Sequence, residues 1–399
     1  MFSILNSNKE QVAILIDIGN GSTTGSVVVY SKDAKPKFIY VVKKFFVISD
    51  KVDGLKLEAE MNSLLEQMLA ILTQKSFEHK YWQGKKKKFD KILISFSSPW
   101  FISKTKNIHL EKDKEFVISK NFLDGIMNQE VEVLKNELHT QNPEETFEVI
   151  ERSIVHSKIN GYTLDDAIGK NTKSFDASLY MSVVSDNFIE KILENLYKHT
   201  HVTHDNVLIN TFPLISFTVI RDLFTKEQNF IIMDVTGEVT DVTMVKGDII
   251  VDTVSIPSGR NFIIRQISKN FNVSTEIAES TLKLFLSKKL EDATSNQMSE
   301  LMVSVEKEWS IYFENALTEL APDMNLPSTM FLTAEGDTAD IYVDFLNMPK
   351  TDTTSIFRKN LKLNYINLEK TSSFYVNESG FALDEFIVLI ALFYKKISN

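Results

Sequence analysis

The chain of 399 residues contains no cysteine. This absence excludes a disulfide framework, a thiolate metal site and a cysteine nucleophile. The seven histidines do not replace these options, because none shows the helical spacing of a His-Glu-x-x-His zinc site. The glycine, lysine and serine or threonine signature of a P-loop is missing, and so is the GxGxxG dinucleotide loop.

Long apolar runs and a leader segment are missing as well. No stretch reaches the roughly 20 apolar residues of a membrane span, and residues 1–11 lack a signal-peptide pattern. We therefore expect a cytoplasmic protein without a transmembrane segment. The net charge of −10 argues against a nucleic-acid partner. The one basic run, Lys85 to Lys88, is interpreted as a solvated loop tip, with a lipid or nucleic-acid contact as the lesser alternative.

What the sequence does contain is a turn of glycine, serine and threonine that occurs twice. Each copy follows a strand that ends in aspartate: Ala13 to Thr24 contains Asp17, and Phe230 to Asp241 contains Asp234. A second apolar run follows each turn, so both segments predict β-hairpins with small-residue tips. Either copy alone could be no more than a tight hairpin, but a chance pair with this placement is much less expected.

The remaining pattern predicts an α/β protein built from two copies of one plan. Strands are expected at 37–48, 91–96, 206–210 and 329–333, and helices at 57–74, 122–138, 186–197, 214–223, 259–270, 275–286, 300–320 and 341–346. Residues 103–183 read as a small α+β insert. The last helix, 381–397, is apolar nearly all round, which favours a buried helix over an interfacial one.

The two turns carry the residue types that hold phosphate and a divalent cation. Backbone amides at small residues let phosphate oxygens approach, and neighbouring hydroxyls add donors. The residues expected at this site are Gly19, Asn20, Gly21, Ser22 and Thr23 in the first turn, and Thr236, Gly237 and Thr240 in the second. Asp17 and Asp234 would hold Mg²⁺ through water, since this cation prefers oxygen ligands and keeps much of its hydration shell.

These residues resemble those of the actin, sugar-kinase and heat-shock-chaperone ATPase superfamily, and within it the chain is most similar to the bacterial FtsA and PilM group. The insert at 103–183, the turn Val254 to Asn261 and the helix with Ala278 and Glu279 carry the narrower resemblance. It covers nearly the whole chain and implies an α/β fold of actin/ribonuclease H-like duplicated domains with an FtsA-type inserted subdomain. We expect no FtsA-type membrane-binding tail after Lys396, which is more similar to PilM.

The resemblance also implies domain boundaries, cofactors and further site residues. A first actin-like domain would comprise 8–102 and 184–228, the inserted subdomain 103–183, a second actin-like domain 229–258 and 326–399, and a helical nucleoside-side subdomain 259–325. The implied cofactors are ATP and Mg²⁺. The residues it adds on the nucleoside side are Gly259, Glu279, Lys283, Glu335, Gly336 and Asp337.

The chain departs from the family at several of these positions. Thr236 and Glu238 stand where the second phosphate loop has glycines, while Glu335 and Asp337 stand where the adenosine loop has glycine and a small residue. An acidic side chain beside a triphosphate is unfavourable unless Mg²⁺ or a lysine intervenes. Residues 95–103, where the family places its water-positioning group, contain no Glu, Asp or Gln. We therefore expect at most a slow ATPase and name no catalytic residue.

Three functions follow from this comparison. The leading one is a nucleotide-binding scaffold that organises or polymerises with partners at the inner face of the cytoplasmic membrane, in cell division or pilus assembly. The alternative is a pseudo-ATPase adaptor that no longer binds nucleotide. The implied partners are further copies of the chain in a dimer or filament, the tail of a membrane protein, a tubulin-like division protein or a pilus-assembly protein. A sugar or acetate kinase is the third, and no matching motif supports it.

Overall fold

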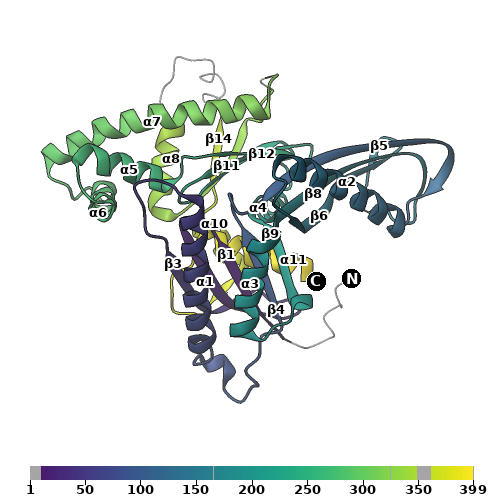
Figure 1. The fold of residues 1–399 in the computed structure, drawn as a ribbon, viewed down its shortest axis with the longest axis horizontal. Helices are drawn as coiled ribbons and strands as arrows, with labels where there is room; N and C mark the ends of the chain where they lie inside the picture. Colours follow the sequence, from purple (N-terminus) through teal and green to yellow (C-terminus); the bar gives the residue numbers. More distant parts are fainter. Residues whose placement is uncertain (1–9, 165, 324, 348–360, 399) are drawn as a thin grey trace.

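Three β-sheets organise the computed structural model, which describes residues 10–398 apart from 165, 324 and 348–360 (Figure 1). Two sheets form the body of the molecule, and the third projects from it as an arm (Figure 1). Each body sheet contains one of the two hairpins that the repeated turn predicts: β1 pairs with β2, and β10 pairs with β11, both antiparallel. The duplicated plan is therefore present.

The first body sheet has the strand order β15-β3-β2-β1-β4-β9. Its strands are β1 (Gln11–Ile18), β2 (Ser22–Tyr30), β3 (Lys37–Phe45), β4 (Lys91–Phe96), β9 (Val207–Thr211) and β15 (Val376–Asn377). Helices α1 (Gly54–Ser76) and α3 (Asp186–Thr200) pack on one face, in a core that includes Leu65, Leu69 and Ile189. Asp53 caps α1 by accepting from two amides of its first turn.

The second body sheet has the order β12-β11-β10-β13-β14. Its strands are β10 (Phe230–Val235), β11 (Thr240–Lys246), β12 (Ile249–Ile256), β13 (Thr329–Ala334) and β14 (Lys362–Tyr365). Its helices are α5 (Arg260–Phe271), α6 (Thr275–Leu286), α7 (Asp292–Leu320) and α8 (Gly336–Asn347), which share a core around the buried Trp309. α7 and α8 begin earlier than predicted, because polar first turns hide a helix start from apolar periodicity.

A middle layer joins the two sheets. Helices α4 (Phe212–Leu223) and α11 (Glu385–Ser398) share one core with Leu15 of the first sheet and Phe331 of the second. The prediction that the last helix is buried is confirmed. Residues 326–399 were expected to lie with the second sheet, but β15, which belongs to this segment, pairs with β3 of the first sheet. The other boundaries stay a prediction.

The arm is built by the insert. It contains β5 (Ile102–Val117), β6 (Phe147–Ile159), β7 (Tyr162–Thr163) and β8 (Asn171–Ser185), in the order β5-β8-β6-β7, with α2 (Lys120–Gln141) against the sheet. Asn160 and Gly161 form the turn that joins β6 to β7, and both residues have positive φ. The charged edge strand β5 was not predicted. Its lysines and acids protect an exposed edge instead of marking a buried one.

Short elements complete the chain: η1 (Lys80–Trp82), η2 (His204–Asn206), α10 (Leu368–Thr371) and η3 (Ser372–Phe374). Among the helices of the described residues, none is long and apolar enough to span a bilayer. β4 runs parallel to β1, and β13 runs parallel to β10, so in each sheet the hairpin tip and the end of the parallel strand share one edge. These two edges face each other and form the candidate site.

Candidate functional site: a closed phosphate clamp

The two hairpin tips touch each other. A Cβ atom built on Gly237 would lie 2.4 Å from the Cα of Gly21, and one built on Gly21 would lie 2.6 Å from the Cα of Gly237. No side chain fits at this approach, which explains glycine at both positions. The residues that the repeated turn predicts as a phosphate clamp are thus brought together, with no gap between the two halves.

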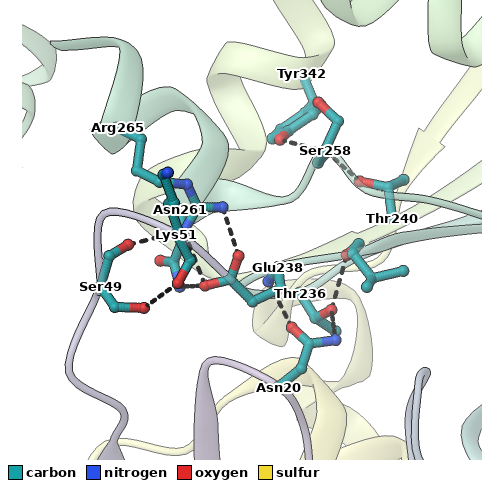
Figure 2. A network of polar contacts seen from close by, with 11 residues as sticks. Asn20, Ser49, Lys51, Thr236, Glu238, Thr240, Ser258, Asn261, Arg265 and Tyr342 are labelled. Carbon is teal, nitrogen blue, oxygen red and sulfur yellow. Dashed lines mark hydrogen bonds and ion pairs between the residues drawn. The ribbon is translucent and has the colours of Figure 1, made fainter. Parts of the chain in front are cut away.

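Asn20 bridges the two tips (Figure 2). Its buried side chain donates from Nδ2 to Thr236 Oγ1 at 2.8 Å and to the carbonyl of Ser98 at 2.5 Å. Its Oδ1 accepts from the main-chain N–H of Glu238 at 2.6 Å. A phosphate oxygen would use the same kind of amide in a nucleotide-bound clamp. Asn20 is one of the predicted nucleotide-binding residues. In this structure its side chain forms hydrogen bonds to the second tip.

The main-chain amides in the first turn of α5 are also bonded to the second tip. The N–H groups of Arg260 and Asn261 donate to the carbonyls of Thr236 and Gly237, at 2.9 and 2.7 Å. A Cβ atom on Gly259 would lie 2.5 Å from each of those two carbonyl oxygens. A helix N-terminus usually offers free amides to an anion. Here those amides bind the second tip, and Gly259 lets the two segments pack.

The carboxylate of Glu238, which was expected to lie where phosphate approaches, is bound by residues of α5. Its carboxylate accepts from Asn261 Nδ2 at 2.8 Å and pairs with Arg265, with Nη2 2.5 Å from Oε2 (Figure 2). Only 9% of the Glu238 side chain is exposed. A bidentate arginine is the partner that a buried carboxylate needs. The acid at the tip is therefore neutralised by α5, and the cleft is closed by Asn20.

Lys43 of β3 neutralises Glu335, the acidic residue at the position where the predicted adenosine loop would have glycine. Its Nζ lies 2.6 Å from Glu335 Oε1 and 3.0 Å from Asp384 Oδ2. Burial alone would lower the pKa of Lys43, but these two carboxylates raise it overall. Burial likewise opposes ionisation of Asp384, and Lys43 still holds the pKa of that carboxyl below its usual range. Sequence analysis missed Lys43 and Asp384, which are more than three hundred residues apart and carry no local motif.

The two strand-end aspartates are buried, and three of their four carboxylate oxygens have no partner within the described residues. These are Asp17 Oδ1 and both carboxylate oxygens of Asp234. Burial and then Asp384 raise the pKa of Asp17 to about 8, and burial and then Asp241 raise the pKa of Asp234 well above its usual range. A buried carboxyl without partners needs either a proton or a cation.

This donor set fits a hydrated Mg²⁺ ion better than a directly bound metal. The two carboxyl groups lie close enough for the charge of Asp17 to raise the pKa of Asp234, so one hydrated ion could serve both. No group of three or more His, Cys, Asp or Glu side chains in the described part of the chain is arranged to hold a metal. Water-mediated binding by Asp17 and Asp234 remains a prediction.

Three of the other predicted donors, Gly19, Ser22 and Thr240, are bonded within the protein. The N–H of Gly19 donates to the carbonyl of Ser22 at 3.1 Å, and the Ser22 hydroxyl lies 3.4 Å from Glu335. Thr240 Oγ1 donates to the carbonyl of Ser258 at 2.8 Å (Figure 2). The Ser22 contact thus joins the two halves of the site, and the Thr240 contact stabilises the second half.

Two cavities of very different size lie along the cleft. The one between the tips has a volume of ≈ 20 Å³ and is lined by Gly21, Thr236, Gly237 and Glu335. This space holds about one water molecule. The second cavity has ≈ 600 Å³ and is lined by residues that include Lys43, Arg260, Glu279, Lys283 and Asp384.

Three of the residues predicted on the nucleoside side, Glu279, Lys283 and Glu335, line this larger cavity, and each of them is in an ion pair. Glu279 lies 3.1 Å from Lys283 and 3.0 Å from Arg260. The pairing to these two cations holds the pKa of Glu279 below its usual range although burial opposes it. Gly336 and Asp337 begin α8, and the side chain of Asp337 lies outside the described part of the structure.

Residues 95–103 receive a carboxylate from the second hairpin. Asp241 accepts from the N–H of Ser98 at 3.4 Å and from Ser255 Oγ at 2.5 Å. The acid that this segment lacks in sequence is thus supplied by Asp241. Its oxygens are already bonded to the protein, so this contact positions the loop after β4.

Comparison with known proteins identifies the fold. No family model and no curated protein matches the sequence. A chain of the PilM-PilN type IV pilus biogenesis complex matches with a TM-score of 0.62 and 12% identity, over 96% of this chain and 98% of that chain. The chain has the actin-like ATPase fold. The predicted fold class is confirmed, and at this identity the PilM-like match shows the fold alone.

Two further structures are similar at lower scores. The ethanolamine utilization protein EutJ from Carboxydothermus hydrogenoformans has a TM-score of 0.45 and 11% identity, with 98% of this chain and 92% of that chain covered. A Bacteroides thetaiotaomicron protein with actin-like ATPase fold and unknown function has a TM-score of 0.38 and 10% identity, with 88% and 95% covered.

Proposed function

We propose that the chain is a PilM-like adaptor that docks a segment of a membrane-anchored partner during pilus-type assembly, and that its phosphate clamp is closed by its own residues. The observation that carries this proposal is the Asn20 bridge between tips that are already in contact. The space between the tips has ≈ 20 Å³ and holds about one water but no phosphate group, while the adjoining cavity, which shares Arg260 and Glu335 with it, has ≈ 600 Å³. Asn20 and the first turn of α5 then stabilise the closed body without nucleotide.

A groove between the arm and the body supports the docking role. It has a volume of ≈ 560 Å³ and is lined by residues 148–155 of β6, by residues 207–210 of β9, and by apolar side chains that include Phe217 and Phe393. Within the described chain the outer edge of β9 pairs with no strand, and β6 pairs with β7 only at Lys158 and Ile159. Two free strand edges beside an apolar floor suit an extended peptide that adds to a sheet.

The second candidate is the nucleotide-binding scaffold, and one observation favours it. The unpartnered oxygens of Asp17 and Asp234 fit the water shell of Mg²⁺, and the adjoining cavity of ≈ 600 Å³ has the volume of a small-ligand site. Nucleotide would then have to separate the tips and replace Asn20. When bound, Mg·ATP would supply charge neutralisation for both aspartates. Hydrolysis would at most be slow, because residues 95–103 offer no free base.

Two measurements test the proposal. Mass spectrometry of freshly purified, denatured protein should release no stoichiometric nucleotide, while stoichiometric ATP or ADP would favour the scaffold. A photo-crosslinking residue at Leu208 of β9 should capture the cytoplasmic segment of a membrane protein, and that segment, made as a peptide, should bind the wild-type protein.

Val155→Arg places a bulky charge in the groove and should abolish peptide binding, whereas Val133→Arg on the exposed face of α2 should leave it unchanged. Equal binding to both variants would refute the groove as the docking site.

A further inference from the structure

The far end of the first body sheet, opposite the clamp, is strongly basic. The register places the start of β1, the turn between β2 and β3 and the start of β4 at this end (bottom of Figure 1). Residues 31–37 and 78–91 lie here and carry nine lysines and three carboxylates. We call these two segments the basic pole. Lys85 to Lys88 are part of it.

The two segments of the basic pole meet in space. Glu378 lies 3.4 Å from Lys37 and 3.9 Å from Lys80, so a single carboxylate contacts both segments. Glu10 adds a second carboxylate, 2.6 Å from Lys85. With these two acids counted, the pole keeps a net charge of +4, whereas the chain carries −10. The charge of the protein is therefore strongly polarised.

A cluster of packed aromatic rings supports the lysine loop 85–88. Phe77 stacks on Phe89 at 4.8 Å between ring centroids, and Trp82 meets Phe77 edge-on at 5.0 Å. Trp82 and Phe89 are buried, while Lys80 and Lys88 are 72% and 66% exposed. The loop is solvated, as predicted, and the aromatic cluster keeps its lysines on the outside. A packed base reduces the entropy that the loop loses when a surface binds it.

We propose that the basic pole binds the anionic headgroups of a membrane surface directly. Clustered lysines near an anionic leaflet are attracted electrostatically, within the screening length of salt. The sequence has no arginine before Arg152, so the pole lacks the planar donors that read phosphates and bases in nucleic acids. A negatively charged protein with one lysine-rich end presents that end to a charged plane and is repelled elsewhere.

The orientation that this contact imposes suits the groove between β6 and β9. β9 runs parallel to β4 and begins at Val207, beside Ile92, so the groove starts at the same end as the basic pole. A segment that leaves the bilayer beside the pole would reach the groove without crossing the molecule. The inference goes beyond the docking function and does not depend on it, because lipid binding needs no partner.

Vesicle co-sedimentation of the full chain tests the inference. Vesicles of equal parts phosphatidylglycerol and phosphatidylcholine should bind the protein, and vesicles of phosphatidylcholine alone should not. Each basic residue near an anionic surface strengthens binding about five-fold, so replacing Lys85, Lys86, Lys87 and Lys88 by Gln should weaken it by at least ~100-fold. Raising the salt from about 0.1 M to about 1 M should release the protein, since this shortens the screening length.

The matched control removes four lysines from the arm. Lys114, Lys120, Lys170 and Lys173 are exposed and far from the basic pole. Their replacement by Gln should leave vesicle binding within about two-fold of wild type, because distant charges are screened. Equal loss in the control, binding to neutral vesicles, or no binding to anionic vesicles would overturn the inference. Tighter binding to a short DNA or RNA duplex than to the vesicles would overturn it too.

Discussion

The two hairpin tips share one sequence pattern, but they take different parts in the contact between the two sheets. The first tip is active in the contact: Asn20 reaches across and binds Thr236 and Glu238. The second tip is passive, since its carbonyls and its acidic side chain are bound by the start of α5 and by Arg265. The difference shows that substitutions which look like decay in one loop are matched by partners elsewhere.

The two ends of the cleft also differ, in the volume that they leave open. At the tips, complementary contacts leave ≈ 20 Å³, while ≈ 600 Å³ remain on the nucleoside side. The ion pairs of Lys43 and of Glu279 show that charges on the open side are also compensated within the protein. The charged side chains along the cleft therefore have partners within the protein itself.

The largest effect should come from the contact between the glycines. Gly237→Ala would place a Cβ 2.4 Å from the Cα of Gly21 and force the tips apart. We expect a loss of about 3 kcal/mol in the free energy of unfolding, as for other overpacked sites, measured by urea denaturation. Gly54→Ala is the control, because nothing lies within 4 Å of its added Cβ. A Gly237→Ala variant as stable as this control would show that the tips do not touch.

The Asn20 bridge should have the next largest effect. Asn20→Ala removes three hydrogen bonds and leaves the Glu238 N–H without its acceptor. We expect a loss of about 2 kcal/mol and faster hydrogen exchange at Glu238. Asn136→Ala on the exposed face of α2 should change neither quantity. If hydrogen exchange at Glu238 is unchanged in the Asn20→Ala variant, Asn20 does not hold the two tips together.

Lys43 should contribute less, and its contribution should depend on pH. Lys43→Met leaves Glu335 and Asp384 without their cation, so we expect a loss of about 1.5 kcal/mol at pH 7, discounted because the group is partly exposed. The pKa of Asp384 is held below its usual range, so this stability is present at neutral pH and is lost as pH falls through that lowered value. The penalty measured at pH 7 should shrink in acid. A penalty independent of pH would point to packing.

The smallest effect should be a gain in stability. Asp17 has a pKa of about 8 in the folded protein against 3.8 as a reference, so the unfolded chain releases its proton first as pH rises. The cost to the folded state therefore grows between about pH 4 and pH 8. Relaxation of the protein and entry of water reduce this cost far below the value of about 4 kcal/mol that the full shift would give. Asp17→Asn should therefore raise the free energy of unfolding by about 1 kcal/mol at pH 7 and by almost nothing at pH 4. Destabilisation at pH 7 in metal-free buffer would contradict this assignment.

The repeated turn carried most of what sequence reasoning predicted. It located both hairpins, and alternation and helical spacing located β4, α4 and α6 closely. β5 was missed because an exposed edge strand is charged along its length. The closure of the clamp was missed because it depends on long-range partners: Asn20 with Glu238, Arg265 with Glu238, and Lys43 with Asp384. A single sequence shows the acid at position 238 but not the arginine that turns it away.

Isothermal titration of Mg·ATP into the wild-type protein tests the closed clamp most directly. We expect no saturable heat up to about 1 mM nucleotide, which corresponds to less than about 4 kcal/mol of binding free energy, since Asn20 and the two glycines fill the phosphate position. Saturable binding at micromolar concentrations would contradict the closed clamp and favour the nucleotide-binding scaffold.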